Sequence, residues 1–170
     1  MVRLDQVLDS WKAIREDAAL AVEEFPAGEL DFRPTPEMDS FRQIARHILN
    51  AGDGLTGMML ARETATGQEF RDRMKAHIRP LADDAGASEL AAALRQSVAE
   101  RCAQLAAQPA EFFQEMITRH FDLQRLTRME MLQFVKEHEL THRSQLFVYL
   151  RLKGMVPATT RRRLARQAGK

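Results

Sequence analysis

The sequence predicts an all-α protein built as a four-helix bundle. Its 170 residues include 24 Ala and 19 Leu, which favour helices, but only 7 Val and 5 Ile, which favour strands. Gly and Pro together contribute only 14 residues. Apolar residues also recur at three- and four-residue steps in four segments of roughly 20–25 residues, as expected for helices that bury one face. The alternative is an irregular helical domain that assembles only as a dimer.

The first helix is expected from about Leu4 to Phe25. Its apolar residues form one stripe, and Pro26 and Gly28 end it. Further prolines keep residues 26–39 out of helix, because proline lacks the backbone donor that a helix interior needs.

The second helix begins after Ser40, whose spacing to Gln43 predicts a capping box, and ends near Arg62. Residues 64–87 then form a long connection with a short amphipathic piece around Phe70–Ile78. A connection of this length can return along the bundle, so the second and third helices can run parallel.

The third helix begins at Ser88 and stops before Pro109. Residues 110–126 contain an apolar cluster that predicts a short helix packed against one end of the bundle. The fourth helix opens with a second capping box, Thr127 to Glu130, and runs to about Lys153.

The bundle therefore spans residues 1–157, and residues 158–170 form a basic C-terminal tail. Positions 161–170 carry five basic side chains and no acidic ones, whereas the rest of the chain has four more acidic than basic side chains. A domain with a net negative charge binds nucleic acid poorly. The tail is expected to be a solvated, partly frayed end, with phosphate or partner binding as the alternative.

The chain contains one cysteine, Cys102, which excludes an intramolecular disulfide and a cysteine zinc site. No apolar run approaches 18 residues, and the start lacks a signal-peptide core. These features predict a cytoplasmic protein without a membrane anchor.

Two histidines one turn apart, His138 and His142, lie on the fourth helix, where both can bind one metal ion. The string His-Glu-x-x-His is also the signature of zinc proteases, which usually take a third ligand from farther along the chain. No His, Asp, Glu or Cys follows His142, so the protease hypothesis is set aside. The alternative is a pair of ordinary half-buried histidines.

The third ligand must come from upstream, and His47 is the best candidate. It follows Ile44 by three residues, so it is expected on the apolar side of the second helix, with Ala51 and Gly54 leaving room for a pocket. Two inward histidines and a third on a facing helix are a common way to build a metal site in a bundle.

Two segments resemble the DinB/YfiT family of proteins, which are proposed to be metal-dependent bacterial enzymes. The segments are FRQIARHILNAGDG and EHELTHRSQLFVYLRLKGMVP. The family shows a histidine on the second helix and a His-x-x-x-His-Arg-x-Gln run on the fourth, followed by Leu-Arg, a Gly turn and Pro. Those positions are here His47, His138, His142, Arg143, Gln145, Leu150, Arg151, Gly154 and Pro157. Ser144 stands where the family usually has Gly.

The resemblance implies a bundle with up-down-down-up topology, often a homodimer, and one divalent metal ion on the three histidines. The expected ion is zinc or nickel, with iron or manganese as alternatives. Some relatives are transferases or isomerases that use a low-molecular-weight thiol, and others are called hydrolases. The predicted function is therefore a metal-dependent enzyme acting on a small molecule, by hydrolysis or thiol-dependent transfer. The alternative is a non-catalytic metal-binding stress-response bundle.

Two residues beside the histidines are candidates for catalysis. Glu139 could reach the site as a base or as a hydrogen-bond acceptor for a ligand, and the alternative is a solvated surface carboxylate. Arg143 could orient an anionic substrate, or it could pair with a neighbouring acidic residue.

The other polar groups predict less. His77 and His120 are expected at the surface of connecting segments, and Asp53 is expected as a surface charge because its helical phase differs from that of His47. Cys102 falls on an apolar stripe, which predicts a buried, inert thiol. The third helix is rich in alanine on more than one side, and this excess apolar surface also predicts a homodimer.

Overall fold

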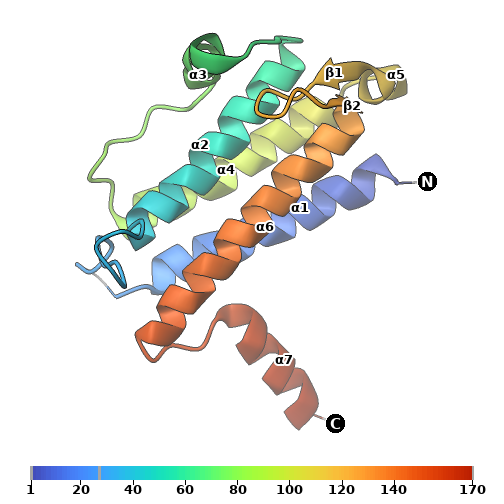
Figure 1. Cartoon of the computed structure of the whole chain (residues 1–170). Helices are drawn as coiled ribbons and strands as arrows, with labels where there is room; N and C mark the ends of the chain where they lie inside the picture. Colours follow the sequence, from blue (N-terminus) through green and yellow to red (C-terminus); the bar gives the residue numbers. More distant parts are fainter. Residues whose placement is uncertain (1, 27, 170) are drawn as a thin grey trace.

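The computed structural model describes residues 2–26 and 28–169. Four long helices, α1 (Leu4–Glu24), α2 (Phe41–Leu60), α4 (Ala87–Ala106) and α6 (Arg128–Leu152), form the bundle (Figure 1). The other elements are α3 (Gly67–Ala76), α5 (Ala110–Gln114), β1 (Met116–Thr118), β2 (Arg125–Thr127) and α7 (Ala158–Ala168). The predicted four-helix bundle is confirmed, and no described helix is both long and apolar enough to cross a membrane.

Both predicted capping boxes are present. The Ser40 hydroxyl accepts from the backbone N–H of Gln43 at 3.2 Å, and the Gln43 side chain accepts from the Ser40 N–H at 2.8 Å. Thr127 and Glu130 make the same reciprocal pair at the start of α6. These local signals fix where the two helices that carry the histidines begin.

The helix directions follow from contacts at the bundle ends. Phe25, just after α1, stacks on Phe41 at the start of α2 with ring centroids 3.8 Å apart. Arg42 donates to the carbonyl of Ala85 just before α4, so α2 and α4 start at the same end and run parallel. Near the end of α6, Tyr149 donates to the backbone just before α2 at 2.7 Å. The topology is therefore up-down-down-up, and α1 and α2 each pack against both α4 and α6.

A polar layer separates two apolar clusters of the core. At its centre, Arg15 of α1 and Glu139 of α6 form an ion pair in which both side chains are 0% exposed. The Nε of Arg15 donates to Glu139 Oε2 at 2.8 Å, and Nη1 donates to the Leu94 carbonyl and the Ser97 hydroxyl, each at 3.3 Å. Nη2 donates to the carbonyl of Ile48 in α2 at 3.4 Å. One guanidinium thus joins α1 to the other three bundle helices.

The same layer contains Asp53, which was expected at the surface. That prediction is wrong, because α4 covers this side of α2 and leaves Asp53 only 1% exposed. Its carboxylate accepts from Ser97 Oγ at 2.8 Å, from Arg79 Nε at 2.9 Å and from Arg101 Nε at 3.2 Å. Buried charge is thus compensated by two arginines and a hydroxyl.

The region between α4 and α6 contains both an expected and an unexpected element. The short helix predicted from the phenylalanine cluster is α5, in which Phe112 and Phe113 are buried. The antiparallel hairpin of β1 and β2 was not predicted, since three-residue strands give almost no periodicity. It pairs Ile117 with Leu126 and lies beside the start of α6 (Figure 1).

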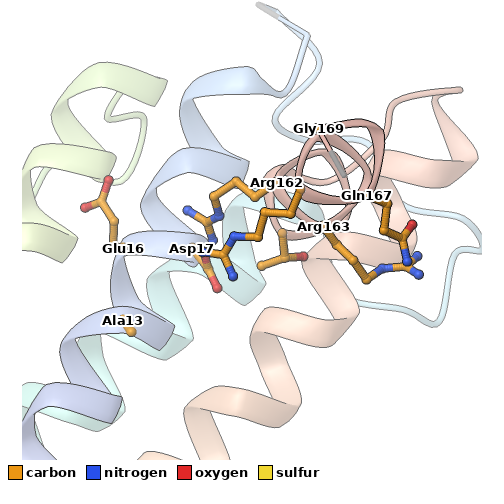
Figure 2. A pocket seen from close by; sticks show the side chains of 9 residues that line it. Ala13, Glu16, Asp17, Arg162, Arg163, Gln167 and Gly169 are labelled. Atoms are coloured by element: carbon orange, nitrogen blue, oxygen red, sulfur yellow. Dashed lines mark hydrogen bonds and ion pairs between the residues drawn. The ribbon is translucent and has the colours of Figure 1, made fainter.

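The C-terminal tail was expected to be frayed, and this prediction is wrong for the described residues 158–169. They form α7, which Arg161 and Arg162 tie to Glu24 and Asp17 of α1. Figure 2 shows the open cleft of about 960 Å³ between α1 and α7. It is lined by Ala13, Glu16, Asp17, Thr159, Arg162, Arg163, Arg166, Gln167 and Gly169. None of the three candidate metal ligands lines this cleft.

Helix α4 leaves several small apolar side chains in solvent. Ala91 and Ala93 are buried, while Ala92, Ala99 and Ala103 are exposed on its outer face. The homodimer expected from this surface stays a prediction. Light scattering at micromolar concentration is expected to give twice the 19.4 kDa of one chain, and a mass of one chain would contradict it.

Candidate metal centre

The structure brings the three predicted histidines together at the junction of α2 and α6. Nε2 of His138 lies 3.1 Å from Nε2 of His47 and 3.1 Å from Nε2 of His142. Among the described residues these three form a group whose potential ligand atoms all lie within 4.8 Å of one another. His47 lies 91 positions before His138 and 95 before His142 in the sequence. The three meet because α2 and α6 pack side by side.

The three rings are tilted toward a common point rather than stacked. The angles between the ring planes are 62° for His47 and His138, 76° for His47 and His142, and 71° for His138 and His142. Their ring centroids are 4.5–5.0 Å apart. Rings at these angles can each present an Nε2 lone pair to one shared ion without stacking on one another, as metal ligation requires.

Gln145 fixes the orientation of one ring. Its side-chain oxygen lies 2.7 Å from Nδ1 of His142. Because an amide oxygen only accepts, the proton is assigned to Nδ1, and Nε2 of His142 faces the other two histidines with a free lone pair. Gln145 thus holds the His142 ring in the tautomer that ligation of a metal through Nε2 would require.

The three imidazole nitrogens are better arranged to bind one cation than to hydrogen-bond to one another. Two metal bonds of about 2.0–2.1 Å at a tetrahedral angle place their nitrogens about 3.3 Å apart, close to the 3.1 Å separations here. Without an ion, Nε2 of His138 can share a hydrogen with only one of its two neighbouring nitrogens, so one close N···N contact has no hydrogen between its atoms. A divalent cation satisfies all three lone pairs at once.

The pKa values of two histidines also favour ligation. Loss of hydration, with the neighbouring His142 and His47, lowers the pKa of His138 from 6.5 to about 4. Loss of hydration and the charge of His142 lower the pKa of His47, and Asp39 opposes this shift. Both imidazoles are therefore neutral at pH 7, which is the form that binds a metal.

These shifts predict a pH dependence for the metal-free protein. As the pH falls below about 6.5, an unfolded His138 takes up a proton that the folded protein does not bind until about pH 4. Stability is therefore full above pH 6.5 and declines between pH 6.5 and 4. Urea unfolding at pH 7.5 and 5.0 is expected to show a smaller loss in His138→Gln than in the unchanged protein. An equal loss in both proteins would contradict this assignment.

The triad lies nearer the surface than expected. His47 is exposed and the other two histidines are half-buried, so the site is open to solvent rather than enclosed by the core. The pocket expected beside Gly54 does not form, because the side chain of Met74 from α3 occupies the space that a Cβ at Gly54 would need. The triad therefore lies at the solvent-exposed edge of the α2–α6 seam.

The two candidate catalytic residues point elsewhere. Glu139 is fully buried, and Arg15 donates to both of its oxygens. The surface-carboxylate hypothesis is wrong, and no hydrogen bond among the described residues joins Glu139 to the histidines. Arg143 donates to Asp17 of α1 at 3.2 Å and lies over the ring of Phe147, so it reaches away from the triad toward α1.

The remaining histidines and the cysteine take structural positions. His77 lies 3.2 Å from a carboxylate oxygen of Glu63 and packs against α2. His120 stacks on Phe70 at 3.5 Å and is half-buried rather than a free surface residue. Cys102 is buried, and burial raises the pKa of its thiol to about 11, as expected for an inert group.

Two solved structures share this fold. A DinB-like protein, YjoA, from Bacillus subtilis is 18% identical, with a TM-score of 0.65 over 89% of this chain and 93% of that one. YfiT from Bacillus subtilis, described as a probable metal-dependent hydrolase with an unusual four-helix bundle topology, is also 18% identical. Its TM-score is 0.63, over 90% of this chain and 89% of that one. A search of curated proteins gave no match.

One protein-family model matches nearly the whole chain. The model of the DinB family matches residues 1–168, a span that includes the bundle, the histidine triad and α7. This is the family that the motifs around His47 on α2 and around His138 and His142 on α6 resemble. The chain therefore belongs to the DinB family.

Proposed function

We propose that this protein is an enzyme that uses a divalent metal ion, held by His47, His138 and His142, to act on a small molecule by hydrolysis or thiol-dependent transfer. The observation that carries the proposal is the convergence of three imidazoles at an open seam between α2 and α6. An ion bound there supplies Lewis-acid chemistry at its remaining coordination positions. Imidazole ligands suit zinc or nickel first, with iron or manganese as alternatives.

The number of ligands favours an enzyme over a structural metal site. A structural zinc is usually enclosed by four protein ligands, whereas the described residues contribute three to this group. Glu139, which follows His138 on α6, is paired with Arg15 and does not complete the set. A site with three ligands at the surface leaves room for a substrate.

The protein's own residues hold this site in a defined state. Gln145 keeps His142 in the tautomer that ligates through Nε2, and low pKa values keep His47 and His138 neutral. Three neutral ligands leave the full charge of the ion in place, so an anionic or strongly polarised substrate group is favoured. The description of YfiT as a probable metal-dependent hydrolase supports the hydrolytic option.

Turnover with and without metal tests the proposal. Purified protein is stripped with a chelator, reloaded with zinc or nickel, and assayed against panels of small esters, amides and thiol adducts. We expect turnover only by reloaded protein, and loss of turnover in His47→Ala despite a folded bundle. Equal activity of stripped and reloaded protein, or no turnover of any substrate in the panels, would count against an enzyme of this class.

A further inference from the structure

A row of aromatic rings leads away from the triad along α6. The ring of Phe134, one turn before His138, lies 6.1 Å from the His138 ring. Phe121, in the loop between β1 and β2, lies 5.3 Å from Phe134. The hairpin thus places an aromatic ring two ring-to-ring steps from a metal ligand. We call Phe121 and Phe134 the aromatic wall.

The aromatic wall is held in place although it is open to solvent. Phe121 is 54% exposed. The guanidinium of Arg119 lies 4.5 Å from the centre of the Phe121 ring and 5.3 Å from that of Phe134. Arg119 is itself fixed by Asp122 and by Gln124, to which it donates at 2.9 Å and 2.6 Å. A large ring that is exposed yet immobilised has lost conformational freedom without gaining burial.

The loop that carries Phe121 is anchored and strained. On the side of α3, His120 stacks on Phe70 at 3.5 Å, so the loop bridges α3 and α6. At its tip Leu123 has a φ of 58°, in the left-handed region, and is 61% exposed. This conformation is unfavourable for an L-residue with a side chain, because the Cβ comes too close to the following carbonyl oxygen. Strain and exposed apolar groups occur together in one short loop beside the triad, a combination typical of functional loops.

We propose that the aromatic wall binds a planar apolar group of the substrate, whose polar end is held at the histidine triad. This inference rests on the proposed function and specifies its substrate class as small molecules that carry an aromatic or similarly flat apolar group near the reacting bond. Continuity of the wall with His138 favours such a ligand over a separate partner. Arg119 is a positioning residue, because its guanidinium contacts both rings while its Nε and Nη2 donate to Asp122 and Gln124 of the loop.

Hydroxamates test this assignment without requiring turnover. Acetohydroxamate and benzohydroxamate share a metal-binding head but differ in the ring. Calorimetry with zinc-loaded protein is expected to give about tenfold tighter binding of benzohydroxamate, since stacking of one ring has about this effect. In Phe121→Ser the ratio is expected to fall to about twofold while the zinc content is unchanged. The matched control, Leu164→Ser, replaces a residue of similar exposure (50%) on α7 and is expected to keep the full ratio.

The outcomes separate the two proposals. An unchanged ratio in both Phe121→Ser and the milder Phe121→Leu, with acetohydroxamate still bound, overturns the aromatic wall and leaves the metal site standing. Binding of neither probe to the zinc-loaded, unchanged protein would mean that the ion offers no open position to a ligand, which overturns the proposed function and the wall with it. A change of mass in Phe121→Ser by light scattering, with the ratio unchanged, would make the wall an interface between two copies of the chain and also overturn the assignment.

Discussion

Arg15→Met is expected to lower the free energy of unfolding by about 3–5 kcal/mol, the usual cost of leaving one charge of a buried pair without its partner. The replacement leaves the Glu139 carboxylate fully buried and removes the bonds from α1 to the Leu94 carbonyl, Ser97 and Ile48. A loss of this size is a large part of the stability of an ordinary domain. Urea unfolding followed by circular dichroism measures it. A loss below about 1 kcal/mol would show that removing Arg15 does not leave Glu139 as an uncompensated buried charge.

The double variant Arg15→Met/Glu139→Leu is expected to recover most of that stability, since an apolar replacement of both partners removes the desolvation cost along with the attraction.

Gly52→Ala tests the same layer from α2. A Cβ at Gly52 would overlap the Arg15 guanidinium and the Glu139 carboxylate. The matched control is Gly86→Ala, because no atom lies within 4 Å of a Cβ at that position. The Gly86→Ala control is expected to change the free energy of unfolding by less than about 1 kcal/mol.

Replacing any one of His47, His138 and His142 by alanine is expected to weaken zinc binding by at least about 100-fold. A lost ligand has a larger effect than the roughly 10–100-fold typical of a residue that only supports a ligand. Helix content is expected to survive, because none of the three histidines belongs to the apolar clusters of the core. Competition with a fluorescent zinc chelator gives the affinities, and circular dichroism gives the helix content.

Two further variants, Gln145→Leu and His120→Ala, give reference values for the loss of zinc affinity. Gln145 supports His142 through one hydrogen bond of 2.7 Å, so its loss is expected to weaken zinc binding by about 10–100-fold. His120 stacks on Phe70 outside the triad, and its replacement is expected to leave the affinity unchanged. Full zinc affinity in His47→Ala would remove His47 from the site and require another third ligand.

Features set by short-range rules could be predicted from the sequence. Both capping boxes depend on residues three positions apart, and both are present at Ser40 and Thr127. The spacing of His138 and His142 places them on one helix face, and the motif on the second helix identifies His47 as their partner. The structure brings all three together. The parallel course of α2 and α4 followed from the length of the connection between them.

Features that depend on partners distant in the sequence could not be predicted. Helical phase placed Asp53 at the surface, but its partners Arg79, Ser97 and Arg101 come from the crossover and from α4. The pairing of Arg15 with Glu139 joins positions 124 residues apart, and no periodicity reports it. Likewise, two arginines of helix α7 pair with Glu24 and Asp17 of α1, which lie 137 and 145 positions earlier in the sequence.

Elemental analysis of untagged protein, purified without a metal-affinity column, tests the central claim most directly. The triad predicts about one divalent transition-metal ion per chain, lost together with any of the three histidines. A content far below one ion per chain, even after the protein is incubated with zinc and with nickel and then desalted, would contradict the metal centre. So would full occupancy in a variant that lacks both His138 and His142.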